Sequence, residues 1–206
     1  MRCLVTTNRK FHRLAVSSLY VICSMLFLNS FSLASDPGKN GKIVFISNST
    51  GSFQIYTINP DGTDLFQVTN FPPATMDFAY APDFSPDGKR ILFPRDMTGA
   101  LELYVINADG TGLTQITQDG LFHAAPRWSP DGSQIVFATV GKYGLLVIAT
   151  VRSGGTDTKL LTTPVWESLG ASYTPDGKHI VFSSQQEGLV SALWIMDTDG
   201  RPEATN

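Results

Sequence analysis

An aromatic residue, a tight turn and an apolar run follow one another three times in this chain of 206 residues. The copies read FSPDGKRILF from Phe84, WSPDGSQIVF from Trp128 and YTPDGKHIVF from Tyr173, at intervals of 44 and 45 residues. An earlier apolar run opens at Ile43, which lies 48 residues before Ile91. Internal similarity at a period of 20 to 50 residues is typical of repeat architectures, so this feature constrains the fold first.

A second turn motif keeps step with the first. INPDGT around Asp61 recurs as INADGT around Asp109, as RSGGT around Gly154 and as DTDGR around Asp199, at intervals of 48, 45 and 45 residues. Two turns in phase within each period indicate four short antiparallel strands per unit.

The second unit illustrates the expected strands, which fall at about 80–84, 90–93, 102–106 and 113–117. In its first turn, Pro86 sets φ, Asp87 bonds locally and Gly88 accepts a left-handed conformation. The apolar runs are continuous rather than alternating, which indicates strands that are buried on both faces.

A four-stranded sheet that packs between copies of itself satisfies both observations. We therefore expect an all-β fold, a β-propeller of about four incomplete repeats, with a solenoid of stacked hairpins as the alternative. The expected blades span 41–77, 78–121, 122–166 and 167–206.

The strand count along the repeats is three, four, four and three, because no strand is expected before Gly41 and the last unit stops at Asn206. Three explanations stay open: a fragment of a longer protein, which we favour, a ring completed by two or more chains as a homo-oligomer, or an irregular self-closed arc.

Residues 1–34 have the pattern of a signal peptide. Four basic and no acidic residues precede Ser35, an apolar run at 19–28 predicts a signal helix, and Ser32-Leu33-Ala34 resembles a cleavage site. A retained anchor is the alternative. Cleavage leaves no membrane span in 35–206 and predicts a periplasmic or secreted protein.

Cleavage also changes the charge and the cysteine content. Eleven of the 15 basic residues and all 18 acidic residues follow residue 34, so the mature net charge is −7, and Cys3 and Cys23 are both removed. An acidic chain argues against binding to nucleic acid.

The repeats FSPDGKRILF and ELYVINADGTGLTQIT resemble the TolB-like propeller repeat, a WD40-like Pro-Asp repeat of exported bacterial proteins, over about 41–206. The resemblance implies a non-enzymatic protein-binding module, with a partner such as an envelope lipoprotein of the peptidoglycan-associated type. TolB-type proteins carry an α/β domain before the propeller, where this chain has only 35–40. The repeat also occurs in peptidases and polysaccharide lyases, so the propeller portion of a larger exported enzyme is the alternative.

The sequence lacks the Gly-x-Ser-x-Gly, phosphate-loop and His-Glu-x-x-His motifs of common enzyme classes. We expect no catalytic activity, no cofactor and no metal. The turn aspartates, including Asp197 and Asp199, are explained by turn chemistry.

Residues for partner binding are expected in the loops that return from the outer strand of one blade to the inner strand of the next. These candidates are Asp77, Tyr80, His123, Arg127, Trp166 and Glu167. An exposed loop histidine without function is the alternative for His123. His179 is expected at the surface, and the repeated aromatic residues are expected to pack between blades.

Overall fold

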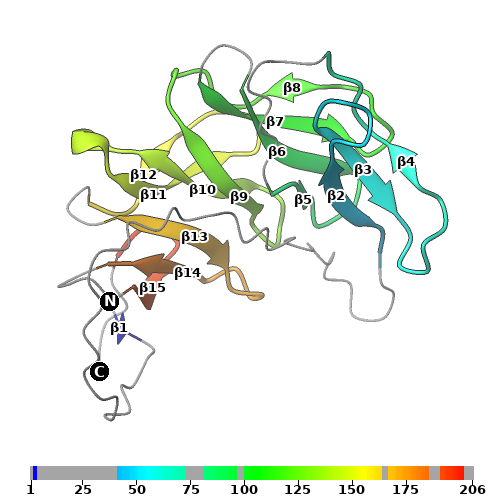
Figure 1. Cartoon of the computed structure of the whole chain (residues 1–206). Helices are drawn as coiled ribbons and strands as arrows, with labels where there is room; N and C mark the ends of the chain where they lie inside the picture. Colours follow the sequence, from blue (N-terminus) through cyan, green and yellow to red (C-terminus); the bar gives the residue numbers. More distant parts are fainter. Residues whose placement is uncertain are drawn as a thin grey trace, which may run out of the picture.

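The computed structural model describes residues 2–3, 41–72, 81–96, 100–163, 167–185 and 191–201, which form four antiparallel sheets (Figure 1). Blade 1 contains β2 (Ile43–Ser47), β3 (Gln54–Ile58) and β4 (Phe66–Gln67). Blade 2 contains β5 (Asp83–Phe84), β6 (Arg90–Asp96), β7 (Leu101–Asn107) and β8 (Thr114–Gln115). Blade 3 contains β9 (His123–Trp128), β10 (Gln134–Val140), β11 (Leu146–Arg152) and β12 (Lys159–Leu160). Blade 4 contains β13 (Ser168–Tyr173), β14 (His179–Ser184) and β15 (Ala192–Asp197).

The four sheets follow one another in an arc, as the change from cyan to orange in Figure 1 shows. Blades 1 to 3 keep the order of their strands along the chain, as do β13, β14 and β15 of blade 4, and every neighbouring pair is antiparallel. The all-β, four-stranded propeller arrangement predicted from the repeat is therefore confirmed.

One strand was not expected. Arg2–Cys3 forms β1, which pairs antiparallel with β15, with Arg2 opposite Ile195 and Cys3 opposite Trp194. The prediction that no strand precedes Gly41 is thus wrong in this structure. The edge of β15 offers unpaired backbone groups, and an extended segment satisfies them whatever its side chains.

Blades 2 and 3 have apolar runs that are buried on both faces. Ile91, Leu92 and Phe93 of β6 are fully buried, as are the three residues 135–137 of β10. In β14 the burial alternates instead, with Ile180 and Phe182 buried and Val181 half-buried. Among the equivalent strands β2, β6, β10 and β14, continuous burial therefore occurs in the two blades that have a neighbour on each side.

Three apolar clusters join the blades in succession. Successive residues point to opposite faces, so Ile135 and Phe137 pack with blade 2, whereas Val136 and Ala138 pack with blade 4. A third cluster joins blade 1 to blade 2 and includes Val44 and Phe93. The core is consequently a series of interfaces between sheets.

The repeated aromatic residues lie at these interfaces, as expected. The guanidinium carbon of Arg90 lies 4.7 Å from the centre of the Trp128 ring, and the Tyr173 hydroxyl bonds to Oε1 of Gln134 at 3.1 Å. Burial raises the pKa of Tyr173. The backbone N–H of Trp128 also donates to Oδ2 of Asp83 at 3.0 Å, which links the inner strands of blades 2 and 3.

The first turn of blades 2, 3 and 4 is closed by a further side-chain contact. The Ser129 hydroxyl donates to Asp131 at 2.6 Å and accepts the backbone N–H of Gln134 at 2.9 Å, while Gly132 has φ of 69°. The same contacts recur around Ser85 and around Thr174. The Ser or Thr before the proline and the aspartate after it therefore both stabilise the hairpin.

Replacing Phe137 by alanine should lower the free energy of unfolding by about 3–5 kcal/mol, because a fully buried ring is lost between blades 2 and 3. Phe45 holds the same register position in blade 1 but is only half-buried. Phe45→Ala should therefore be clearly less destabilising in urea unfolding followed by circular dichroism. Equal losses would show that both faces of blade 1 are covered.

The turn aspartates should make stability depend on acid pH. Hydrogen bonds from Ser129 and then from Ser133 lower the pKa of Asp131 below its ordinary 3.8. The contribution is therefore present above about pH 4 and is lost as pH falls through the lower, folded-state pKa. In thermal unfolding, Asp131→Asn should lower Tm above pH 4 and approach wild type at lower pH. A deficit that does not change with pH would contradict this.

Candidate functional site

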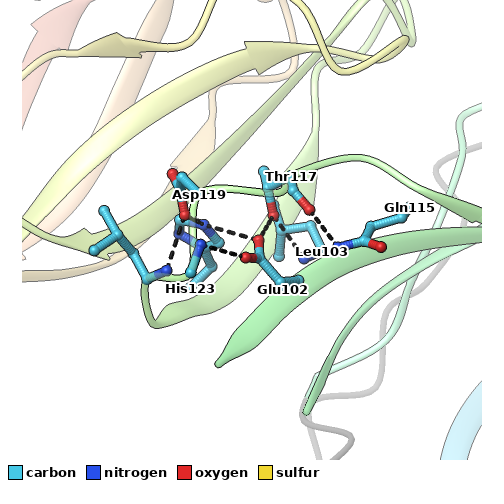
Figure 2. Close-up of polar contacts among 8 residues, drawn as sticks. Glu102, Leu103, Gln115, Thr117, Asp119 and His123 are labelled. Carbon is cyan, nitrogen blue, oxygen red and sulfur yellow. Dashed lines mark hydrogen bonds and ion pairs between the residues drawn. The ribbon is translucent and has the colours of Figure 1, made fainter. Parts of the chain in front are cut away.

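A group of polar side chains ties the β8–β9 connection to β7. Glu102 lies on β7, and its carboxylate accepts hydrogen bonds from the Thr117 hydroxyl and, at 2.7 Å, from the backbone N–H of Gly120. Thr117 in turn accepts the N–H of Leu103 at 2.9 Å (Figure 2). One buried carboxylate thus fixes the start of the loop.

His123 is the first residue of β9, and its side chain is 1% exposed. Its Nε2 lies 2.9 Å from Oδ1 of Asp119 and 3.4 Å from Oε2 of Glu102. The ring also meets Phe137 edge-on, with 5.0 Å between centroids. The sequence placed His123 in an accessible loop, either as a partner contact or as an exposed histidine without function, and that placement is wrong, because His123 belongs to β9 and is buried in the interface between blades 2 and 3.

Asp119 contacts the buried His123 and is itself partly exposed to solvent. Its side chain is 44% exposed, and Oδ1 also accepts the backbone N–H of Leu121 at 3.0 Å. Glu102, Asp119 and His123 each offer one donor atom of a type that binds metals, and these three atoms lie within 4.8 Å of one another. We call these three residues the carboxylate–histidine cluster.

Blade 1 contains the uncharged version of the same loop attachment. Gln54 has the register position of Glu102, and its Oε1 accepts the Thr69 hydroxyl and the backbone N–H of Phe71, both at 2.9 Å. In blade 3, Val147 replaces the polar residue, and among the described residues the retained contact is the hydrogen bond from the Ile148 N–H to the Thr162 hydroxyl. A neutral amide is therefore sufficient to hold such a loop.

Two large apolar side chains project from the loop that the cluster fixes. Leu121 is 41% exposed and Phe122 is 44% exposed, and the Phe122 carbonyl accepts the N–H of Val140 at 3.3 Å. Tyr143, 77% exposed, lies in the 3₁₀ turn Lys142–Gly144 between β10 and β11. The antiparallel topology places both loops at the same end of blade 3.

The other residues predicted for partner binding lie in different surroundings. Arg127 donates from Nη1 to the carbonyl of Pro126 at 2.9 Å and to that of Ala81 at 3.5 Å, so it lies against the inner strand of blade 2. Glu167 is exposed just before β13, and its carbonyl accepts the Ser184 hydroxyl at 3.0 Å. Within the described part of the chain, no hydrogen bond joins either residue to the cluster. The predicted residues outside the described ranges are Asp77, Tyr80 and Trp166.

Sequence reasoning missed Glu102 and Asp119. Glu102 interrupts the apolar strand LELYVI at a position where Gln54 is polar in blade 1, and comparing the two repeats would have indicated it. No pattern in the sequence singles out Asp119, because its approach to His123 depends on the conformation of the loop.

Comparison with known proteins supports the architecture. A family described as "TolB beta propeller domain" matches residues 30–205. The chain belongs to the TolB β-propeller family. A TolB homolog of Chlorobium luteolum is 33% identical over 146 residues, covering 71% of this chain and 32% of the relative. The TolB-like chain thus spans about a third of the length of the curated relatives it matches.

Solved structures share the fold of this TolB-like chain. TolB from Acinetobacter baumannii superposes with a TM-score of 0.65 at 27% identity, covering 76% of this chain and 38% of that one. An oligogalacturonate lyase from Vibrio parahaemolyticus has a TM-score of 0.62 at 13% identity, covering 78% and 48%. The second likeness shows the fold alone. The residues described here include no helix that is long and apolar enough to cross a membrane.

Replacing Thr117 by valine should lower the free energy of unfolding by about 1–3 kcal/mol, because the buried N–H of Leu103 and the carboxylate of Glu102 both lose a partner. Thr162→Val, the matched change in blade 3, removes only the backbone contact and should cost less. Denaturant unfolding of both variants measures the difference. A larger loss for Thr162→Val would contradict the anchoring role of Glu102.

Proposed function

We propose that this TolB-like chain is a non-enzymatic protein-binding module of the bacterial cell envelope, and that its partner contacts the loop end of blade 3. The observation that carries the proposal is the exposed pair Leu121 and Phe122, which projects from a loop whose backbone is fixed by Glu102 and Asp119. Tyr143 adds an aromatic side chain at the same end of the blade.

Exposed apolar side chains on a fixed loop suit protein recognition for two reasons. Burying them against a partner removes apolar surface from water, and aromatic side chains are frequent among the residues that dominate binding energy. A loop already held in position also loses little conformational freedom on binding. In this proposal the buried His123 positions the loop through its contact with Asp119 and does not touch the partner.

The family supports the class of partner. The relatives named TolB homolog, together with the expected signal peptide, favour a periplasmic or secreted protein and an envelope lipoprotein as partner. Glu167, exposed just before β13, extends the proposed surface toward blade 4, whereas Arg127 remains a separate candidate nearer the other end of β9. Asp77, Tyr80 and Trp166 remain candidates from the sequence. The proposal also keeps open that two or more copies of the chain associate as a homo-oligomer to complete a ring.

The test compares two Leu-Phe pairs in the same chain. Leu121→Ser with Phe122→Ser should weaken binding to the soluble domain of a peptidoglycan-associated lipoprotein at least about tenfold, because the apolar contact is removed. Leu65 and Phe66 are also exposed but lie at blade 1, after its last turn. Their double serine variant should bind like wild type in biolayer interferometry.

Each outcome decides one part of the proposal. Equal losses in the two variants would remove the loop end of blade 3 as the binding surface. Failure of the wild-type chain to bind the lipoprotein would overturn that choice of partner.

A further inference from the structure

The carboxylate–histidine cluster carries charge that the loop attachment does not require. In blade 1, neutral Gln54 makes the same two contacts that Glu102 makes in blade 2, one with a threonine hydroxyl and one with a loop N–H. The register positions of His123 in blades 2 and 4 are Ala79 and Ser168. The acid and the imidazole therefore occur together at a single junction between blades.

The charges around the cluster favour a cation. Glu102 is 3% exposed and lies beside Asp119, a second carboxylate. Arg95, the cross-strand partner of Glu102 on β6, supplies one positive charge, and its guanidinium carbon lies 3.2 Å from the centre of the Phe71 ring. With His123 neutral, two carboxylates and one guanidinium leave one negative charge. A cation bound among the three donors would be attracted by it.

The distances from Nε2 of His123 to the two carboxylates suit a first-row transition metal, and the two carboxylate oxygens lie within 4.8 Å of each other. Metal–ligand distances of about 2.0–2.1 Å place neighbouring ligand atoms about 2.9 Å apart in an octahedral site and about 3.3 Å apart in a tetrahedral one. Nε2 of His123 lies 2.9 Å and 3.4 Å from the two carboxylate oxygens. A proton on Nε2 also fits these distances, so a proton and a metal ion would compete for the same nitrogen.

A threonine lies opposite His123 in the register of β9 and β10. Nδ1 of His123 and the Thr139 hydroxyl are both buried without a hydrogen-bond partner among the described atoms, and the two residues are directly opposite in register. At the equivalent position in blade 4, the Ser168 and Ser184 hydroxyls are 3.1 Å apart. A neutral imidazole with its proton on Nδ1 leaves Nε2 free for a metal, and metal-binding histidines usually donate this second N–H.

We propose that Glu102, Asp119 and His123 form a binding site for a divalent transition-metal ion, with Zn²⁺ as the best match to one imidazole nitrogen and two carboxylate oxygens. The exposed side of Asp119 gives the ion access and leaves room for water as a further ligand. A bound ion would link β7, the β8–β9 loop and β9 through Glu102, Asp119 and His123. The site does not depend on the proposed partner.

Isothermal titration calorimetry of the untagged full chain with ZnCl₂ tests the proposal. Wild type should bind one Zn²⁺ ion at this site, and Glu102→Gln should weaken binding at least about tenfold. Glutamine keeps both loop contacts, as Gln54 does, so this variant should remain folded, which circular dichroism checks. Asp119→Asn keeps the acceptor for the Leu121 N–H and should weaken binding similarly.

The matched control is His179, which lies 3.7 Å from Asp197 in blade 4. His179→Ala should bind Zn²⁺ like wild type, whereas His123→Ala should not bind at this site. The visible spectrum of bound Co²⁺ should change in Asp119→Asn and not in His179→Ala. No binding by wild type, or equal binding by wild type and Glu102→Gln, would overturn the proposal.

Discussion

The packing of each sheet against the next is the interaction on which the rest of this structure depends. A single sheet of three or four short strands cannot bury two apolar faces, so each blade needs neighbours. Ile135 and Val136 are adjacent in the chain yet pack on different blades. Burial in the middle blades is therefore continuous along a strand, and it becomes alternating in β14. The stability of the fold and the placement of each blade against the next follow from these interfaces.

Successive blades are also offset relative to each other in a regular way, which we call the stagger. The residue that precedes each apolar run meets the aromatic residue of the following blade, as Arg90 meets Trp128 and Gln134 meets Tyr173. This stagger brings the start of β9 beside the start of β7. His123 can therefore reach Glu102 although they lie in different sheets. The proposed binding loop and the proposed metal site both result from that one junction.

The proposed binding loop and the proposed metal site both lie where the chain departs from its repeat. Thr69, Thr117 and Thr162 make the same contact in three blades and serve the fold. Glu102 and His123 break the pattern at the same junction, and the loop contacts of Glu102 are ones that a neutral glutamine also makes at Gln54. The TolB-type propeller thus provides a fixed frame on which a few substitutions at the ends of strands define chemistry.

Several features could be read directly from the sequence because they are local. The turns at residues 85–88 and 107–110, the four strands between and around them, and the packing of Trp128 follow from residue types at fixed offsets. In blade 2 the predicted strands at 90–93 and 102–106 lie within β6 and β7, whose ends extend further than expected. Pairing added residues there because neighbouring strands continue their hydrogen bonds beyond the apolar run.

The sequence by itself determined the blade, since apolar periodicity and turn chemistry act within about 45 residues. Only the tertiary structure decided what lies where blades meet. The burial of His123, its approach to Asp119 and the pairing of β1 with β15 depend on loop conformation and on the stagger of whole sheets. No periodic pattern encodes those distances, because the side chains involved occur once and their neighbours are set by packing across the interface.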